Sequence, residues 1–325
     1  MLTMKKIDYP LKGTADHVKL TADYMSLFAA NLANMESRWS QWKTDNHVTT
    51  IPENVAGLLV AEVDKVADIY NRFIALGIPS TQPSAKNPSK TVRSDEFKEL
   101  DKIFAYTNKY DSIIADFFMN HAAQLHISTC HYCEMAYINT YARPKHHGSS
   151  TTYSSKQQFD VDHFLPKKIC PIIGLSLFNF VPSCQVCNSR IKSYKVLGSN
   201  KNEWEKFNPA NETYDLDRNV TIRLRMWRRP STTFRNPNDY YIHFRCKNGY
   251  RQAVDFFHLE ERYEFHKSEA MRLKLLKAKY PESTIKKISA LLCKPASDIK
   301  EDLFHKKFLE KHDRCFAKLT RDILK

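Results

Sequence analysis

The chain lacks any long hydrophobic run. No stretch of about 18 apolar residues occurs, so no transmembrane helix and no membrane partner are expected. The N-terminal sequence MLTMKKIDYPLKG also lacks the apolar core of a secretion signal, which predicts a cytoplasmic protein. No internal repeat is found, and this excludes a repeat architecture.

Acidic residues are also in short supply. The 325 residues include 36 acids against 50 lysines and arginines, for a formal net charge of +14. This excess favours a polyanionic partner, either nucleic acid or an anionic membrane surface. Because 42% of the residues are hydrophobic, the chain can bury a substantial core and is not expected to be disordered. Its length predicts two or three domains.

The first 127 residues have the pattern of helices. Apolar residues recur at intervals of three and four, as in Val63, Val66, Ile69 and Phe73. Residues 77–93, rich in proline, serine and lysine, have no periodicity and are interpreted as a linker or mobile loop. Helical character resumes after Ser94, which is a good N-cap residue. A helical N-terminal region over residues 1–127 follows from this pattern.

Beyond residue 198 the pattern changes to strands and then to basic helices. Residues 220–227 and 240–246 predict a β-hairpin, and amphipathic helices rich in lysine follow from about Ala253. These lysines fit a solvated helix face or a surface that faces DNA. The fold class expected is α+β, with a central module over residues 128–197 and a C-terminal hairpin-and-helix region over residues 198–325.

Four of the eight cysteines have the spacing of a zinc site. Cys130-His-Tyr-Cys133 and Cys184-Gln-Val-Cys187 are two C-x-x-C pairs, and in a reducing compartment disulfides are not expected. Two such knuckles complete the tetrahedral thiolate shell that Zn²⁺ prefers, with no open position for water. We therefore predict a structural zinc that clamps together the ends of the intervening segment. The remaining cysteines are interpreted as buried small hydrophobic residues: Cys170, Cys246, Cys293 and Cys315.

The segment between the cysteine pairs carries the polar residues with catalytic potential. It contains Asp160-Val-Asp162-His163-Phe-Leu-Pro166-Lys167 and then Asn179, and Asn188-Ser-Arg190-Ile-Lys192 follows the last cysteine. An Asp-His pair alone is weak evidence, because it often only caps a turn. Its position between two cysteine pairs, with two asparagines behind it, is far more specific. His146 and His147 are placed in an exposed loop rich in glycine, serine and threonine.

This pattern resembles the HNH, or ββα-metal, endonucleases that contain a four-cysteine zinc. The motif D-V-D-H is similar to that in the HNH domain of RNA-guided CRISPR nucleases. The run H-F-x-P-K followed by C-x-x-C-N resembles the PtuB-like HNH nucleases of Septu and retron anti-phage systems. Residues 255–262 also look like the helix start that follows the β-hairpin in those proteins. The resemblance covers residues 128–195 well and 200–270 loosely, and the first 127 residues match no motif.

The resemblance implies a role for each residue of the motif. His163 would be the general base, Asp162 and Asn188 the ligands of a catalytic divalent ion, and Asn179 the residue that orients the base. The commonest form of the family motif has a histidine at the position of Asn188. With carboxylate and amide oxygens as ligands, Mg²⁺ or Mn²⁺ suits the site better than Zn²⁺. A histidine with a pKa of about 6.5 is suited to accept the proton of the attacking water. The ends produced would be 5′-phosphate and 3′-hydroxyl.

Several of these residues also have structural interpretations. Asn188 would serve as a helix N-cap, Asn179 as a turn residue, and Asp160 as a second metal ligand or a solvated acid. The phosphate contacts expected are Lys167, Arg190 and Lys192, each with a plain surface role as the alternative. Since successive strand residues face opposite sides, the strand is expected to end at about Asp162 so that Asp162 and His163 can face one site.

Three functional hypotheses remain open from the sequence. The first is metal-dependent cleavage of DNA, and the second is a zinc-stabilised nucleic-acid-binding module without catalysis. The third, compatible with the first, is an effector subunit of an anti-phage defence complex that acts with a partner such as an ATPase. The helical N-terminal region would then be the docking surface for that partner, because little chemistry is visible there.

Overall fold

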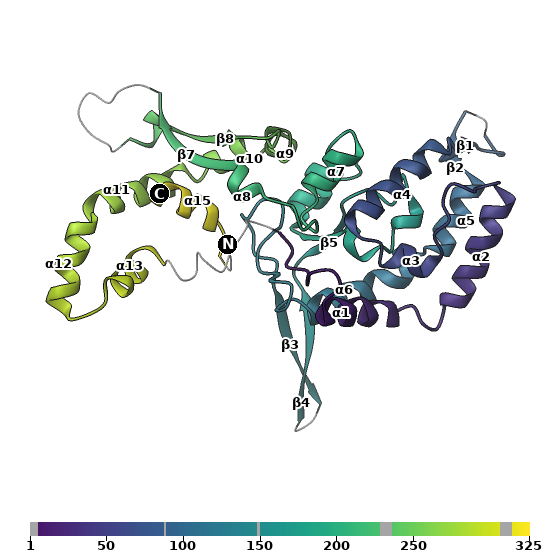
Figure 1. Ribbon diagram of the computed structural model, residues 1–325, viewed down its shortest axis with the longest axis horizontal. Coiled ribbons are helices and arrows are strands. Elements are labelled where there is room, and N and C mark those ends of the chain that lie inside the picture. Colours follow the sequence, from purple (N-terminus) through teal and green to yellow (C-terminus); the bar gives the residue numbers. More distant parts are fainter. Residues whose placement is uncertain (1–5, 88, 148–149, 228–235, 306–313) are drawn as a thin grey trace. The chain divides into compact units, whose positions relative to one another are not determined.

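The computed structural model describes the chain except residues 1–5, 88, 148–149, 228–235 and 306–313 (Figure 1). The chain divides into two compact units. The larger unit comprises residues 6–127 and 139–214, and the smaller unit comprises residues 128–138 and 215–325, each without the residues excepted above. This division differs from the boundaries predicted after residues 127 and 197, because the N-terminal helices share one unit with residues 139–214.

The larger unit combines helices with three two-stranded antiparallel sheets. Its helices are α1 (Ala15–Ser26), α2 (Leu32–Asp45), α3 (Val55–Leu59), α4 (Val63–Ala75), α5 (Asp95–Ile103), α6 (Asp111–Asn120) and α7 (Lys201–Phe207). Its strands are β1 (Thr81–Pro83), β2 (Thr91–Arg93), β3 (Thr140–His147), β4 (Ser150–Gln157), β5 (Asp160–His163) and β6 (Phe180–Ser183). Short helical turns complete it: η1 (Tyr106–Tyr110), η2 (Pro171–Ile173), η3 (Leu177–Asn179) and η4 (Val186–Lys192).

The helices of the larger unit begin at capping residues and bury their apolar faces. The Thr14 hydroxyl accepts the His17 N–H at the start of α1, and the Ser94 hydroxyl accepts the Phe97 N–H at the start of α5. The predicted N-cap at Ser94 is therefore confirmed, as is the helical character of this region. The core is rich in aromatic side chains that are fully buried: Tyr24, Phe28, Trp39, Tyr70, Phe118, Phe164, Phe178 and Phe180.

Two buried hydrogen bonds join the N-terminal helices to the segment between β5 and β6. The Tyr24 hydroxyl on α1 donates to the Leu175 carbonyl at 2.6 Å, and the Ser176 hydroxyl donates to the Leu58 carbonyl at 2.6 Å. Buried polar groups are costly to leave unpaired, so these bonds set the position of the segment against the helices. The N-terminal helices are thus part of the scaffold around residues 160–192.

Two segments interpreted as loops contain strands. Within residues 77–93, β1 pairs with β2, and the Ser84 N–H donates to the Lys90 carbonyl at 2.8 Å across the turn. Arg93 anchors this hairpin through Asp101 and the Lys168 carbonyl. His146 and His147 lie at the end of β3, in a hairpin with β4, and not in a loop.

The smaller unit contains one β-hairpin and a series of helices. Its strands are β7 (Val220–Met226) and β8 (Tyr240–Cys246), within a residue of the predicted runs. Its helical elements are α8 (Leu216–Asn219), η5 (Pro237–Asp239), α9 (Arg251–Phe256), α10 (Leu259–Glu264), α11 (Lys267–Lys279), α12 (Glu282–Leu292), α13 (Ala296–Phe304) and α15 (Ala317–Leu324). The run 255–262, expected to start a helix, instead spans the junction of α9 and α10, because His258 adopts a left-handed conformation.

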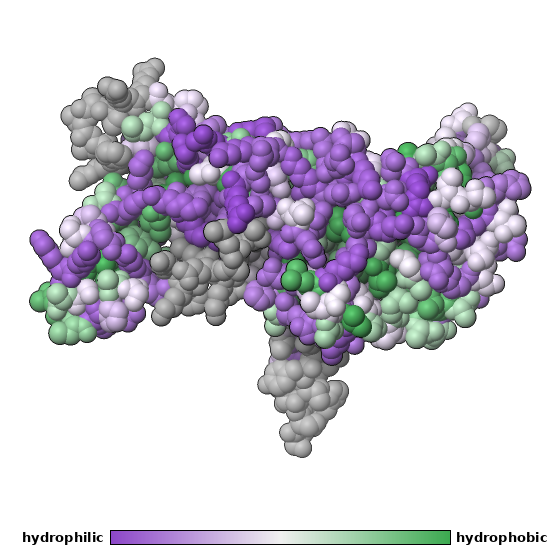
Figure 2. All heavy atoms as spheres, viewed as in Figure 1, coloured by the Kyte–Doolittle hydropathy of each residue, from purple (hydrophilic) through white to green (hydrophobic). Residues whose placement is uncertain are grey.

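Polar residues predominate on one face of the molecule. On the face shown in Figure 2, hydrophilic residues cover most of the area and hydrophobic residues gather in small patches. Within the described ranges, every helix is too short or too polar to cross a bilayer.

Candidate active site and metal centre

A cavity of about 760 Å³ in the larger unit collects most of the predicted catalytic residues. Asp162, His163 and Asn188 all line it, together with Asp160 and Lys167. The other walls come from two parts of the larger unit. Tyr106, Asp111 and Asp116 belong to η1 and α6, and Lys156 belongs to the β3–β4 hairpin. The sequence contains no signal for these last four, because their proximity depends on contacts between segments far apart in the chain.

The Asp162-His163 motif lies on an antiparallel pair of strands that is followed by a helical turn. Strand β5 pairs antiparallel with β6, with His163 opposite Phe180 and Asp162 opposite Val181. The turn η4 begins two residues after Cys184 and carries Asn188 and Lys192. β5 ends at His163, one residue later than predicted, yet Asp162 and His163 both line the cavity.

His163 is held by a hydrogen bond from Nε2 and by two aromatic rings. Its Nε2 lies 2.9 Å from the Gly174 carbonyl, which can only accept, so Nε2 donates, and in the neutral form of the ring Nδ1 is the acceptor. The ring packs between Tyr106 and Phe180, at centroid distances of 4.5 and 4.9 Å. Burial, and then the charges of Lys167 and Lys192, lower the pKa of His163 well below its usual value. A neutral histidine with a lone pair on Nδ1 has the protonation state of a general base.

Gly174 allows the carbonyl that holds His163 to approach. A Cβ atom at this position would lie 2.9 Å from the Pro171 carbonyl oxygen and 3.3 Å from Lys167 Cβ. Any side chain would therefore shift the backbone that orients the imidazole.

Asn179 fastens the loop that follows β5. Its amide oxygen accepts the Leu165 N–H at 2.9 Å, and its nitrogen donates to the carbonyls of Leu165 and Ile173 at 3.0 and 3.2 Å. The side chain is fully buried, and its own carbonyl accepts the Phe164 N–H at 2.7 Å. This geometry is compatible with the predicted orienting role, since the loop fixed by Asn179 begins directly after His163.

The Asp162 carboxylate is paired with a buried lysine. The Lys192 ammonium lies 3.1 and 3.2 Å from the two carboxylate oxygens and 2.6 Å from the His163 carbonyl oxygen. The Lys192 residue is 0% exposed. The sequence predicts a phosphate contact for Lys192, but its charge is instead buried against Asp162 and the backbone. The sequence pattern does not distinguish a surface lysine from one that a neighbouring carboxylate draws inside.

Asn188 contacts Asp160 from the first turn of η4. Its Nδ2 donates to Asp160 Oδ2 at 3.1 Å, and the Ser189 hydroxyl donates to the same oxygen at 3.4 Å. With its nitrogen turned to Asp160, Asn188 keeps its amide oxygen for another partner. Asp160 therefore belongs to the site as closely as Asp162 does, a role that its place two residues before Asp162 on one strand already suggests.

The two remaining predicted phosphate contacts differ in position. The Lys167 ammonium lies 3.7 Å from the centre of the Tyr106 ring and 3.0 Å from the Thr107 hydroxyl oxygen, at the wall of the cavity. Burial lowers the pKa of Lys167 to about 8, against the opposing charges of Asp111 and Asp101. Arg190 is exposed on η4. The side chains of Lys167 and Arg190 can therefore each contact a phosphate that enters from solvent.

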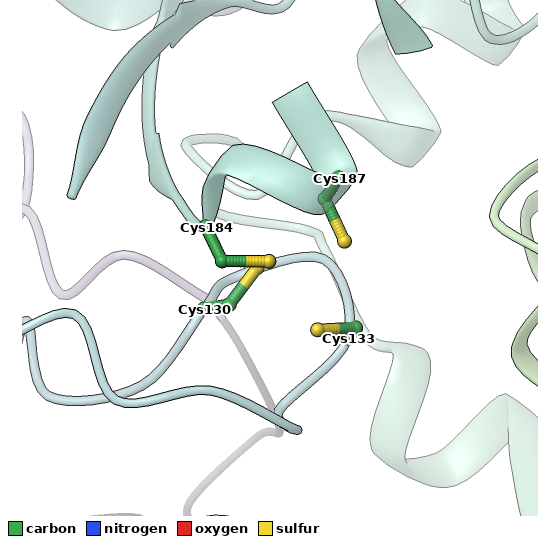
Figure 3. A group of neighbouring side chains, drawn as sticks. All are labelled: Cys130, Cys133, Cys184 and Cys187. Atoms are coloured by element: carbon green, nitrogen blue, oxygen red, sulfur yellow. The ribbon is translucent and has the colours of Figure 1, made fainter. Parts of the chain in front are cut away.

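The four cysteines of the C-x-x-C pairs form a cluster. Their sulfur atoms all lie within 4.8 Å of one another (Figure 3). Sulfurs bound at about 2.3 Å to one tetrahedral zinc would be roughly 3.8 Å apart, so the cluster is compatible with a zinc site. The Met135 N–H points to Cys133 Sγ at 3.4 Å, and the Cys130 N–H donates to the Ala136 carbonyl at 2.9 Å. These bonds form a tight turn that directs both thiols of the first pair inward.

The other four cysteines lie in different surroundings. Only Cys170 is fully buried, and burial raises the pKa of its thiol. Cys246 and Cys315 are half-buried, and Cys293 is exposed. The interpretation of all four as buried hydrophobic residues is therefore correct for Cys170 alone. No disulfide bond joins any two of the eight cysteines, all of which lie among the described residues.

Oxygen ligands alone do not form a second cluster of this kind. Among the residues that the structure describes, the four cysteines are the one group of three or more Cys, His, Asp or Glu side chains close enough to hold an ion. The predicted ligands of the catalytic ion, Asp162 and Asn188, both line the cavity, but the Asp162 carboxylate is paired there with the Lys192 ammonium.

Comparisons of the chain with family models, curated proteins and solved structures found no match.

The buried pair of Asp162 and Lys192 allows a test of the site's architecture by stability. Replacing Lys192 by methionine leaves the Asp162 carboxylate buried without its partner, which costs about 3–5 kcal/mol in other proteins. We expect Lys192→Met to lower the free energy of unfolding in urea by about that amount. Lys168→Met, at an exposed lysine whose ammonium lies over the Tyr194 ring, is the matched control and should change it by less than about 1 kcal/mol. Equal stabilities of the two variants would contradict the buried pair.

Proposed function

We propose that the protein is a metal-dependent endonuclease that hydrolyses phosphodiester bonds of DNA in this cavity. One observation carries the proposal: an imidazole, two carboxylates and an amide line the same cavity, on a hairpin and the helical turn that follows it. A base beside hard oxygen ligands is the combination that phosphodiester hydrolysis requires. The net charge of +14 supports a polyanionic substrate.

His163 would act on the attacking water. Its Nδ1 accepts a proton while the water oxygen forms a bond to phosphorus and the bond from phosphorus to the 3′ oxygen breaks. Nε2 stays bonded to the Gly174 carbonyl, so the ring keeps its orientation as it gains charge. The 3′ oxygen leaves as a hydroxyl by taking a proton from solvent. The neutral state of His163 lets it act without first losing a proton.

Asp160, Asp162 and Asn188 would hold a Mg²⁺ or Mn²⁺ ion. When bound, such an ion supplies positive charge to the phosphate oxygens and the leaving oxygen as negative charge builds. Asn179 keeps the loop after His163 in place, and Lys192 keeps the Asp162 carboxylate oriented. Lys167 would bind a neighbouring phosphate from the wall of the cavity, where its ammonium is already placed by Tyr106 and Thr107.

The cysteine cluster would hold a structural zinc. Four thiolates close the coordination shell, so this ion would not bind the attacking water. Cys187 immediately precedes Asn188, and the Asn188 N–H donates to the Cys184 carbonyl at 3.0 Å. Zinc binding at the second pair would therefore stabilise the start of η4, from which Asn188 reaches the cavity.

On the resemblance alone, we also propose that the chain is the effector of an anti-phage defence system and works with an ATPase or another subunit. The surface of α1 to α6 that faces away from the cavity is the docking surface proposed for that subunit. Cleavage that appears only after the partner is added would support this part of the proposal.

Cleavage of supercoiled plasmid tests the proposed function. The purified chain should convert supercoiled plasmid to nicked or linear forms with Mg²⁺ or Mn²⁺, and brief treatment with a chelator should stop the reaction until the ion is restored. Binding to plasmid without any cleavage, with either ion and with the partner subunit present, would favour the alternative of a zinc-stabilised nucleic-acid-binding module.

A further inference from the structure

The long hairpin of β3 and β4 has no role in the chemistry described above. Its strands pair over eight positions each, from Thr140 opposite Gln157 to His147 opposite Ser150. At about 3.4 Å per residue the ribbon is roughly 27 Å long. It extends away from the helices of the larger unit (Figure 1), and no third strand joins it among the described residues. An isolated two-stranded ribbon is marginally stable in water, so a bound partner would stabilise it.

The composition of this hairpin is unusual for the chain. Between Glu134 and Asp160 the sequence contains no acidic residue, although acids make up 36 of the 325 residues overall. The charged residues of the two strands are all basic, namely Arg143, Lys145 and Lys156. Serines and threonines, which can donate hydrogen bonds to phosphate oxygens, make up most of β4.

The register places the basic positions on one face. Partners across an antiparallel pair share a face, and faces alternate along each strand. Tyr141 pairs with Lys156, Arg143 with Ser154 and position 145 with position 152, so these positions lie on the same face. The opposite face has only uncharged residues and His146 at its register positions. The described side chains on the basic face are exposed, including Tyr141 at 52%.

The base of the hairpin reaches the candidate active site. Lys156 and Gln157, the last residues of β4, line the cavity that contains Asp160 and His163. A polyanion bound along the basic face would therefore lead directly to the catalytic residues.

We propose that the β3–β4 hairpin is an arm that binds in the major groove of duplex DNA, with its basic face toward the phosphates. This proposal builds on the proposed function, because it specifies the substrate as double-stranded DNA. The major groove of B-form DNA is about 12 Å wide and admits a two-stranded ribbon. The major groove of duplex RNA is deep and narrow and does not. Because the ribbon contains no acidic residue, no carboxylate on it repels the DNA phosphates.

Binding measured without cleavage tests the arm separately from the nuclease activity. The full chain carrying His163→Gln, with or without Arg143→Gln and Lys145→Gln, is titrated into a labelled 30-base-pair DNA duplex at several salt concentrations. Loss of two phosphate contacts should weaken binding about tenfold and reduce the slope of log Kd against log salt by about 1.8. The matched control, Thr151→Gln with Ser155→Gln on the opposite face, should keep the affinity and the slope.

Three results would contradict the proposal that the β3–β4 hairpin binds duplex DNA. They are an unchanged salt slope in the basic-face variant, an equal loss in the control, or an equal loss of affinity for single-stranded DNA and for duplex RNA of the same sequence. The nuclease proposal fails by a different observation, the absence of cleavage by the wild-type chain. If the chain binds duplex DNA through this face but never cleaves it, the proposal of a DNA-binding arm stands and the proposal of nuclease activity is wrong.

Discussion

Substitution of His163 should abolish DNA cleavage while zinc binding persists. General-base catalysis contributes about 10²- to 10⁴-fold to a rate, and no other histidine lines the cavity among the described residues. We expect His163→Ala to cleave supercoiled plasmid at least about 100-fold more slowly than wild type at saturating Mg²⁺. The rate of nicking under single-turnover conditions is the measurement. The zinc content of the variant should equal that of wild type, because His163 lies outside the cysteine cluster.

A buried ring cannot be removed without a cost in stability. His163 packs between Tyr106 and Phe180, so alanine leaves a cavity that costs up to about 3–5 kcal/mol for a large aromatic side chain. His163→Gln separates stability from chemistry, because its amide can still donate to the Gly174 carbonyl but has no basic nitrogen. This variant should melt close to wild type and remain inactive.

A histidine outside the cavity provides the control for this experiment. His47 is exposed and has a positive φ of 52°, a conformation that asparagine tolerates. His47→Asn should therefore cleave as fast as wild type. Substantial cleavage by a folded His163→Gln protein would mean that another group activates the water.

The local pattern of the sequence predicts some elements well. The hairpin of β7 and β8 follows from alternating apolar residues, and Ser94 identifies the start of α5. The pattern does not predict β1 and β2, because Arg93, which anchors them, binds the Lys168 carbonyl 75 residues away in the sequence. It also does not predict β3 and β4, because the serines and threonines of β4 resemble those of a loop. The register alone shows that their basic residues share one face.

In the candidate site, too, some residues are predicted by the sequence and others are not. The motif residues Asp162, His163 and Asn188 are close in sequence or follow a conspicuous cysteine pair, and the structure brings them to one cavity. Tyr106, which packs on His163 and supports Lys167, lies in a helical region without any motif. Its turn η1 is a π-helix, a conformation that often occurs at functional sites, but no sequence pattern announces it.

Loss of one thiol from the cysteine cluster should remove the zinc and destabilise the fold. Structural zinc contributes on the order of 10 kcal/mol of binding free energy, and much of this is folding free energy because the unfolded chain has no preformed site. We expect wild-type protein to contain about one zinc per chain, as four thiolates form one tetrahedral shell. Cys133→Ser should lose most of this zinc, since a serine hydroxyl is a poor ligand for it. Elemental analysis and thermal melting measure both effects.

Two comparisons make the zinc experiment specific. Cys293→Ser removes an exposed thiol outside the cluster and should keep the zinc content and melting temperature of wild type. Cys187→Ser removes a ligand and also loosens the start of η4, so Mg²⁺-dependent cleavage should fall along with zinc, even when Mg²⁺ is in excess. Zinc content in Cys133→Ser equal to that in Cys293→Ser would show that the cluster does not hold the ion. Loss of zinc without loss of cleavage in Cys187→Ser would separate the metal centre from the position of Asn188.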